Sequence, residues 1–223
     1  MSTDNLPFEE SARPYAQAVE KAVLRNLNLR TGMAIQFRKL AAGASKREGQ
    51  FYGAIDGKGV MLGPNEKEDL GLKQDDICIV RGFTGVYEFS FVSKVLQIFS
   101  TPFPYALLAY PATVDAQRAR QSMRTPCVWP VVVQAAAEKI LAQTVDLSPH
   151  GAMLSSGQPL GRVGDCLSLQ LQVTIEGNAS SIGLLGNIRH QSQTPGSSSY
   201  ISGVAFQATG EQEKLMLHYL CQK

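Results

Sequence analysis

Two strand-like runs separated by a short link are the feature that most constrains the fold of this chain. Residues 127–134 are apolar and β-branched and are interrupted only by Pro130, and residues 139–145 alternate loosely between apolar and polar side chains. Two such runs joined by a short polar and alanine-rich link predict an antiparallel β-hairpin. Because a hairpin returns the chain to its starting edge, the residues just before the first run should lie beside those just after the second.

Three basic residues precede this hairpin: Arg118, Arg120 and Arg124. A guanidinium group offers a planar fork of donors that fits a phosphate bidentately and also matches the O6/N7 edge of guanine. Its flat face stacks on a purine. An exposed arginine pair is, by itself, more often a solvated surface than a ligand site.

The stretch that follows the hairpin, residues 146–151, combines Asp146, Ser148 and Gly151. An ionised Asp accepts the N–H donors on the pairing edge of guanine, and a Ser hydroxyl can donate or accept. Gly allows the backbone to turn or to approach a ligand closely. Alone, Asp-x-Ser is usually a turn that bonds its own backbone. Placed beside the arginines, these groups predict an anionic ligand that carries guanine.

The two motifs, RxxxR followed by (D/N)xSxxG, together resemble those of the PilZ domain, a receptor for cyclic di-GMP (c-di-GMP). The matching positions are Arg120 and Arg124 in the first motif and Asp146, Ser148 and Gly151 in the second. Residues 201–206 (ISGVAF) also resemble the closing strand of that family. The resemblance extends from about residue 115 to the C-terminus, and it implies that the matching residues bind c-di-GMP.

Two positions depart from the common pattern of that family. Ala119 stands where many members have a further Arg, which in the family accompanies binding of an intercalated ligand dimer. The sequence therefore leaves open whether one or two ligand molecules bind at the site. Arg118 is an alternative basic residue for the missing Arg. His150 occupies a position where a second Gly is common, and we expect it at the rim of the site. Arg189 is either a further ligand contact or a surface residue.

The upstream half reads as short strands separated by glycine-rich turns, which predicts a small β-barrel. The expected strands are residues 33–37, 51–56, 59–62, 77–80, 86–92 and 95–99. This half, with its Pro-Tyr…Tyr-Pro segment at residues 104–111, resembles the N-terminal split-barrel-like domain of flagellar brake proteins. Downstream, residues 152–154, 166–175, 182–189 and 200–207 join the hairpin to give about six strands, enough for a closed barrel.

The sequence thus predicts a mainly β protein with two small β-barrels in tandem, at residues 1–112 and 113–223, and short flanking helices. A helix over residues 14–29 is expected to pack on its own domain. The helix at 211–220 should place Leu215, Met216, Tyr219 and Leu220 on one face. This second helix either caps the barrel or forms a homodimer contact. Met153 is expected in the core. The predicted boundary puts the arginine motif on the interdomain linker.

Composition excludes several classes of protein. A formal charge of +2 is too small for a nucleic-acid-binding protein. The four cysteines form no CxxC, and no histidine has metal-ligand spacing, so we expect neither a metal nor another cofactor. Scattered thiols, a polar N-terminus and no apolar run of roughly 18 residues indicate a cytoplasmic protein that does not span a membrane.

These observations predict a non-enzymatic c-di-GMP receptor in which ligand binding at the linker reorients the two barrels. No Walker-type loop or supported catalytic set is present in the sequence. The resemblance to flagellar brake proteins implies a role in motility, with a flagellar motor or other effector protein as partner and recruitment to the flagellar basal body. The alternative is a PilZ-like adaptor that binds proteins and no nucleotide.

Overall fold

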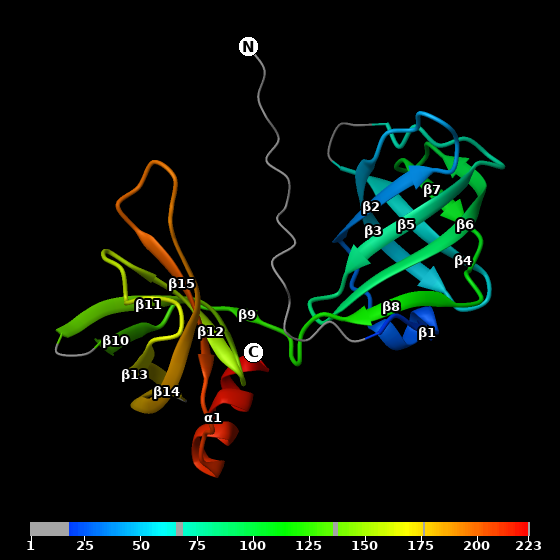
Figure 1. Ribbon diagram of the computed structural model, residues 1–223. Coiled ribbons are helices and arrows are strands. Elements are labelled where there is room, and N and C mark those ends of the chain that lie inside the picture. The colour runs from blue at the N-terminus through cyan, green and yellow to red at the C-terminus, as the bar shows by residue number, and fades with distance from the viewer. Residues whose placement is uncertain (1–17, 66–68, 136–137, 176, 223) are drawn as a thin grey trace. The chain divides into compact units, whose positions relative to one another are not determined.

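The computed structural model describes residues 18–65, 69–135, 138–175 and 177–222. They form two compact units, Met1–Gln121 and Ser122–Lys223 (Figure 1). Each unit contains one antiparallel sheet and its own hydrophobic core. The predicted mainly β fold with two tandem barrels is confirmed.

The first unit is a closed barrel with two added strands. Its elements are β1 (Glu20–Ala22), a 3₁₀ helix η1 (Leu24–Leu27), β2 (Met33–Lys39), β3 (Arg47–Ile55), β4 (Gly59–Pro64), β5 (Ile77–Phe83), β6 (Tyr87–Phe99), β7 (Tyr105–Leu108) and β8 (Val114–Arg118). The order β6-β5-β2-β3-β4-β7 closes because β7 also pairs with β6, and β8 and β1 extend the sheet beyond β6. Alternate residues such as Ile35, Phe37 and Val80 are buried inside, as expected for strands with one solvated face.

The prediction of an amphipathic helix over residues 14–29 is wrong for residues 18–29, and residues 14–17 lie outside the described part of the chain. Strand β1 instead pairs with β8, with Glu20 opposite Ala116. The following 3₁₀ turn buries Leu24 and Leu27 and ends at Asn28, whose left-handed φ of 51° stops further helix. The apolar spacing fitted a helix, but the available pairing edge of β8 decided the structure.

The second unit is also a closed six-stranded barrel. Its elements are β9 (Thr125–Pro126), β10 (Pro130–Ala135), β11 (Glu138–Ser148), β12 (Gly151–Ser156), β13 (Cys166–Ile175), β14 (Asn178–Gln193), β15 (Tyr200–Phe206) and α1 (Glu211–Cys221). The order β10-β13-β14-β15-β12-β11 closes through pairing of β10 with β11. That pair is the predicted hairpin, with Pro130 opposite Gln143 and Ala135 opposite Glu138.

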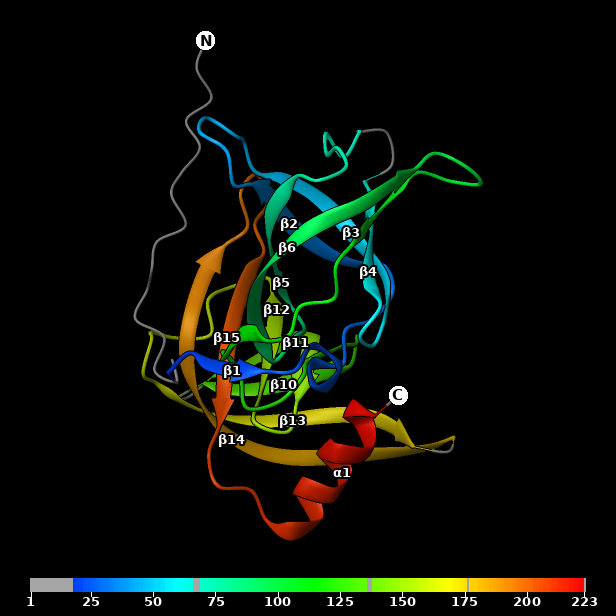
Figure 2. The same ribbon diagram turned by 90° about the vertical axis from the view of Figure 1, so that its right-hand side faces the viewer.

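Helix α1 packs on the core of the second barrel and contacts β11 and β14 (Figure 2). Leu217 and Leu220 are buried at 0% and 6% exposure. Leu215 and Tyr219, which the sequence placed on the buried face, are exposed at 71% and 37%. The helix caps the barrel, but its buried face differs from the predicted one.

The division between the units, after Gln121, differs from the predicted boundary at 112/113. Strand β8 accounts for the difference. It pairs with β6 from Tyr87↔Arg118 to Ser90↔Asp115, and Val114 and Ala116 are buried in the first core. Arg118 and Arg120 therefore belong to the first unit, and Arg124 belongs to the second.

Candidate functional site

Asp146 lies on the outer surface of the second barrel because β11 contains a β-bulge. Thr144 is buried at 1% exposure, so a regular strand would turn the residue two positions later inward as well. The register shifts between Thr144 and Asp146, which leaves Val145 as an extra residue, and Leu147 is the next buried position. The bulge thus gives two consecutive outward side chains and keeps the carboxylate out of the core.

Strand β9 brings Arg124 to this carboxylate. Thr125 pairs with Leu147, and Pro126 pairs with Asp146, along the same edge of β11 that β10 occupies further on. Arg124 Nη1 lies 3.6 Å from Asp146 Oδ2, with side-chain exposures of 38% and 23%. The structure therefore places one predicted arginine beside the predicted acid.

The second carboxylate oxygen of Asp146 lacks a donor. Oδ1 is buried and accepts no hydrogen bond from any residue in the described part of the chain. A buried polar atom without a partner costs about 1–3 kcal/mol. An N–H donor that reaches Oδ1 would remove this cost.

Ser148 and Gly151 have structural contacts. Ser148 is buried at 6% exposure, and its Oγ donates to the carbonyl of Gly151 at 3.0 Å. A Cβ at position 151 would lie 2.4 Å from the carbonyl oxygen of Val204 on β15. The sequence assigned base recognition to Ser148 and ligand access to Gly151. In the structure the hydroxyl closes the turn and the glycine permits close strand packing.

His150 connects the acidic turn to the arginine segment. Its Nδ1 lies 3.1 Å from the hydroxyl of Ser122, which precedes Arg124 by two positions. Sequence reasoning did not select Ser122, because nothing distinguishes it from a solvent-exposed serine between two arginines. The contact ties the segment before β9 to the turn between β11 and β12.

Arg118 and Arg120 are held within the first unit. Arg118 donates from Nε to the carbonyl of Arg120 at 3.2 Å and from Nη2 to that of Gln121 at 2.7 Å. The guanidinium carbon of Arg120 lies 4.8 Å from the centre of the Phe83 ring, a cation–π contact. The backbone N–H groups of Ala119 and Arg120 both donate to Val86 O. Phe83 carried no sequence signal, since it lies far upstream of the motif.

A row of outward residues crosses the barrel from Asp146. Register pairs Asp146 with Met153, Met153 with Gly203, and Gly203 with His190. Met153 is therefore an outer residue and not a core residue as predicted. Arg189 is the extra residue at a second bulge and is exposed. A Cβ at Gly203 would lie 3.7 Å from His190 Cβ and 3.9 Å from Met153 Sδ.

The thiol near the site is unsuited to nucleophilic chemistry. Burial raises the pKa of Cys127, and the nearby Asp146 charge adds to the increase, although a hydrogen bond with Thr144 opposes it. Burial, with a further contribution from Cys127, raises the pKa of Cys221 to about 11. Both thiols stay protonated at neutral pH.

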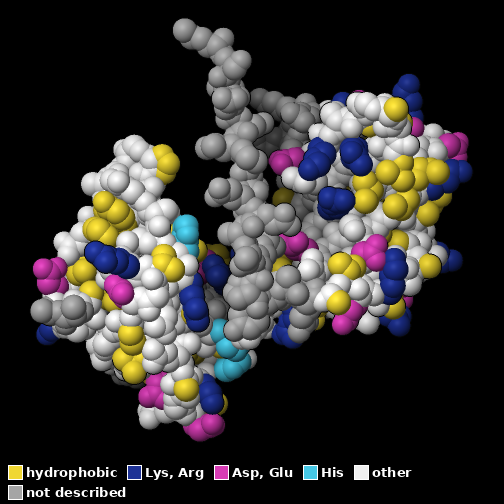
Figure 3. Space-filling view, in the orientation of Figure 1, with side chains coloured by type: hydrophobic (Ala, Val, Ile, Leu, Met, Phe, Trp, Pro, Cys, Tyr) yellow, Lys and Arg dark blue, Asp and Glu magenta, His cyan; other side chains and the backbone are white. Residues whose placement is uncertain are grey.

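Other reactive or membrane-spanning features are not found among the described residues. No group of three or more His, Cys, Asp or Glu side chains there can hold a metal ion. The described helices are too short or too polar to cross a bilayer. Figure 3 shows both basic and acidic side chains on the visible face of each unit, with a group of Lys and Arg side chains on the first unit.

Comparison with known proteins identifies the second part of the chain. The PilZ domain family matches residues 118–222. No curated protein gives a significant match.

Several solved structures match this chain over most of its length. The inhibitor of motility MotI/DgrA from Bacillus subtilis is 16% identical, with a TM-score of 0.48 over 87% of this chain and 96% of that chain. MrkH from K. pneumonia in complex with c-di-GMP is 15% identical, with a TM-score of 0.45 over 88% and 87%. YcgR from Escherichia coli in complex with c-di-GMP is 12% identical, with a TM-score of 0.45 over 85% and 82%.

The family match covers both sequence motifs, from Arg118 through the turn at Asp146 to the last residues of α1. PilZ domains are receptors and not enzymes, so the prediction of a non-enzymatic protein is confirmed. Residues 118–222 of this chain belong to the PilZ domain family.

Proposed function

We propose that this protein is a c-di-GMP receptor. The observation that carries the proposal is the Arg124–Asp146 pair within a PilZ domain. The other carboxylate oxygen of Asp146, Oδ1, is buried and accepts no hydrogen bond from the described residues. A phosphodiester supplies the negative charge that the guanidinium group binds, and guanine supplies the N–H donors that the carboxylate accepts. One ligand type therefore satisfies both groups.

Each arginine has a distinct role in this proposal. Arg124, held at the acid turn, binds phosphate or the O6/N7 edge of guanine. Arg120 stacks its guanidinium face on the ligand or binds the second phosphate, while Arg118 supports the backbone that carries it through its bonds to the carbonyls of Arg120 and Gln121. Ala119 adds no guanidinium group.

Titration calorimetry of the full chain with c-di-GMP tests these roles. Arg120→Ala, Arg124→Ala and Asp146→Ala should each weaken binding at least ~10-fold, because each removes a charge-assisted hydrogen bond of about 1.5–3 kcal/mol. Lys139→Ala is the matched control: it removes an exposed charge from the same barrel, at the second residue of β11, opposite Gln134. Unchanged affinity in all three site variants would reject the assignment. The stoichiometry from the same titration shows whether one or two ligand molecules bind per chain.

We also propose that the ligand changes the arrangement of the two units. The RxxxR motif is divided after Gln121, so Arg120 and Arg124 belong to different units. A ligand held by both would restrict the angle between the barrels. Small-angle scattering with and without c-di-GMP should then give different curves, and identical curves at saturation would remove this part of the proposal.

Such a receptor would act by binding a protein partner in the cytoplasm. The flagellar motor is the partner that we favour. Co-purification of motor proteins from the native host should increase when c-di-GMP is added, and Asp146→Ala should abolish the increase. Absence of c-di-GMP binding by the natural sequence would favour the alternative, a PilZ-like adaptor without a nucleotide role.

A further inference from the structure

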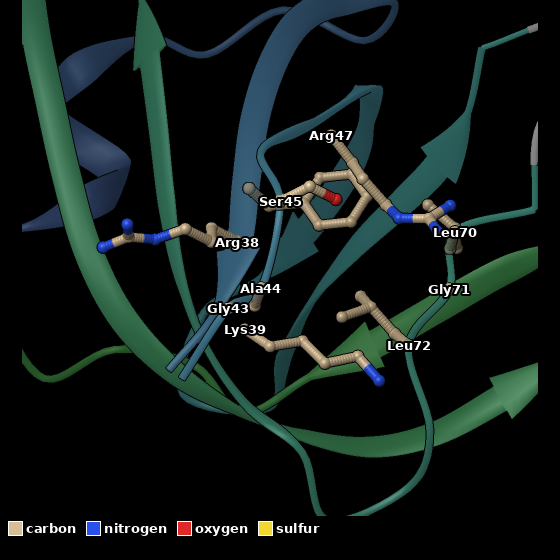
Figure 4. Close-up of a pocket in the computed structure, with 10 residues that line it drawn as sticks. Arg38, Lys39, Gly43, Ala44, Ser45, Arg47, Leu70, Gly71 and Leu72 are labelled. Atoms are coloured by element: carbon tan, nitrogen blue, oxygen red, sulfur yellow. The ribbon is translucent and has the colours of Figure 1, made fainter. Parts of the chain in front are cut away.

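A surface pocket of about 250 Å³ lies in the first barrel, where β2 passes into β3 (Figure 4). It is formed by the end of β2, the loop to β3, the start of β3 and the segment before β5. The lining includes the basic residues Arg38, Lys39 and Arg47 and the apolar residues Phe37, Leu70 and Leu72. All lining residues belong to the first unit, whereas the Asp146 turn belongs to the second.

The lining is cationic. It contains Arg38, Lys39 and Arg47 and no acidic residue. Lys39 Nζ is paired with Asp76 Oδ2 at 2.8 Å, which compensates its charge. Within the described ranges, no carboxylate lies within ion-pair distance of Arg38 or Arg47. Arg38 and Arg47 therefore have no carboxylate partner among the described residues.

Arg47 is held in a defined position. Its Nη1 donates to the carbonyl of Asp69 at 2.8 Å. Gly71, at φ +61°, lies directly against the guanidinium group: a Cβ there would be 2.6 Å from Arg47 Cζ. Figure 4 shows Arg47 and Lys39 reaching toward the segment at Leu70 to Leu72, while Arg38 extends the other way. One fixed fork and one ammonium group thus face the same side of the pocket, and the Arg38 guanidinium group points away from it.

The rest of the lining is suited to an apolar body. Phe37, Leu70 and Leu72 are buried at 2%, 5% and 7% exposure and form the base of the pocket. Ser45 adds an exposed hydroxyl that can donate to an oxyanion. An apolar base below a cationic rim favours a molecule with one anionic end over a free inorganic ion.

We propose that this pocket binds a small organic phosphate. A phosphate monoester carries about −1.5 to −2 charge at neutral pH, and the Arg47 fork and the Lys39 ammonium group face the same side of the pocket to attract it. Its oxygens fit the bidentate geometry of a guanidinium group. The volume is just below the roughly 300–1,000 Å³ that drug-sized ligands occupy, so the organic part is small. This inference does not depend on c-di-GMP binding by the PilZ domain.

Amide NMR titration of the full chain with phenyl phosphate, at about pH 7.5 where the monoester is mostly dianionic, tests the proposal. We expect saturating shifts concentrated at residues 37–47 and 69–73. Inorganic phosphate should perturb the same amides with at least ~3-fold weaker affinity because it lacks the apolar body. Benzoate should also be weaker, because it carries a single charge. Equal affinities for phenyl phosphate and benzoate would contradict recognition of phosphate.

Arg47→Gln should reduce the affinity for phenyl phosphate at least ~5-fold, since it removes the positioned fork. Arg38→Gln, whose side chain points away from the pocket, should change the affinity less than ~2-fold. Lys58→Gln is the matched control, because it removes one exposed charge from the turn at the opposite end of β3. If Arg47→Gln binds like the natural sequence, or if Lys58→Gln is equally impaired, the pocket is not the site.

A second measurement separates the two sites. Saturating c-di-GMP should leave the affinity for phenyl phosphate unchanged, because the pocket is built from the first barrel alone. Displacement of phenyl phosphate by c-di-GMP would place the phosphate in the nucleotide site and overturn the proposal. Binding of phenyl phosphate by a protein that does not bind c-di-GMP would support the pocket while rejecting the receptor function.

Discussion

Gly151 belongs to the recognition motif, yet its surroundings explain its presence without any ligand. A Cβ at this position would lie 2.4 Å from Val204 O, a backbone atom in the paired strand β15. Backbone atoms cannot move aside as the end of a flexible side chain can. The fold therefore requires a glycine at this turn.

This reasoning gives a prediction about stability. Gly151→Ala should force β12 and β15 apart and cost about 1–3 kcal/mol, as overpacking does. The thermal midpoint of the second unit should fall by roughly 4 °C or more. Gly157→Ala is the control, because a Cβ there meets no atom within 4 Å. Equal midpoints for the two variants, measured by scanning calorimetry, would show that the strands yield without cost.

At the residue scale, the sequence predicted which groups form the site better than it predicted individual side-chain contacts. The hairpin argument brings Arg124 to Asp146, and the two are 3.6 Å apart. The contacts of Phe83 with Arg120 and of Ser122 with His150 carried no signal, because both depend on how distant loops are positioned. The β-bulge at Val145 was also hidden, since an extra strand residue leaves no mark in an alternating pattern.

At the scale of elements, α1 shows that an apolar side chain on a helix is not always buried. Leu217 is fully buried, whereas Leu215, two positions earlier, is 71% exposed. Leu217→Ala should cost about 2–5 kcal/mol of unfolding free energy, because it leaves a cavity between the helix and the barrel. Leu215→Ala makes the same chemical change on the solvent side and should stay within about 0.5 kcal/mol. Chemical denaturation of both variants checks this, and similar losses would mean that α1 does not pack as described.

Long alternating strands were predictable, and short elements were not. Strand β13 follows the clean alternation of residues 166–175. Strand β8 reads VDAQR, too short and polar to show a pattern, and it belongs to a sheet whose other members lie upstream. Residues 20–22 likewise became strand β1 because β8 offers them an edge. Pairing between distant segments decided these elements, and a local pattern does not record it.

At the scale of the whole molecule, β8 determines where the chain can be divided. A fragment of residues 1–121 keeps Val114 and Ala116, which are buried in the first core at 0% and 6% exposure. A fragment of residues 1–112 loses both and exposes the edge of β6. We expect the longer fragment to be monomeric with the higher thermal midpoint. Size-exclusion chromatography and thermal unfolding compare them, and equal behaviour would show that β8 adds nothing to the first unit.

Acid should destabilise the first unit through two carboxylates. Hydrogen bonds from Tyr110 and then Arg25 lower the pKa of Asp56 below 3.8, and hydrogen bonds from Lys39 and the Lys73 amide lower that of Asp76. A lowered folded-state pKa gives stability that is present above the unfolded pKa and is lost as pH falls through the folded pKa.

The thermal midpoint of the 1–121 fragment should therefore fall as the pH is lowered below about 4. Asp76→Asn should lower the midpoint near pH 7 and make the decline at acid pH shallower. Asp75→Asn, at an exposed neighbour paired with Lys94, is the control and should preserve the acid profile. A profile that Asp76→Asn leaves unchanged would exclude this carboxylate as a source of the acid sensitivity.

The family match begins at Arg118, inside the last strand of the first sheet, and not at Ser122 where the second unit begins. A cut before Arg118 therefore removes the last residue of β8, which pairs with Tyr87 of β6. A cut after Gln121 keeps β8 whole but leaves Arg120 on one piece and Arg124 on the other, so the arginine motif belongs to neither fragment alone.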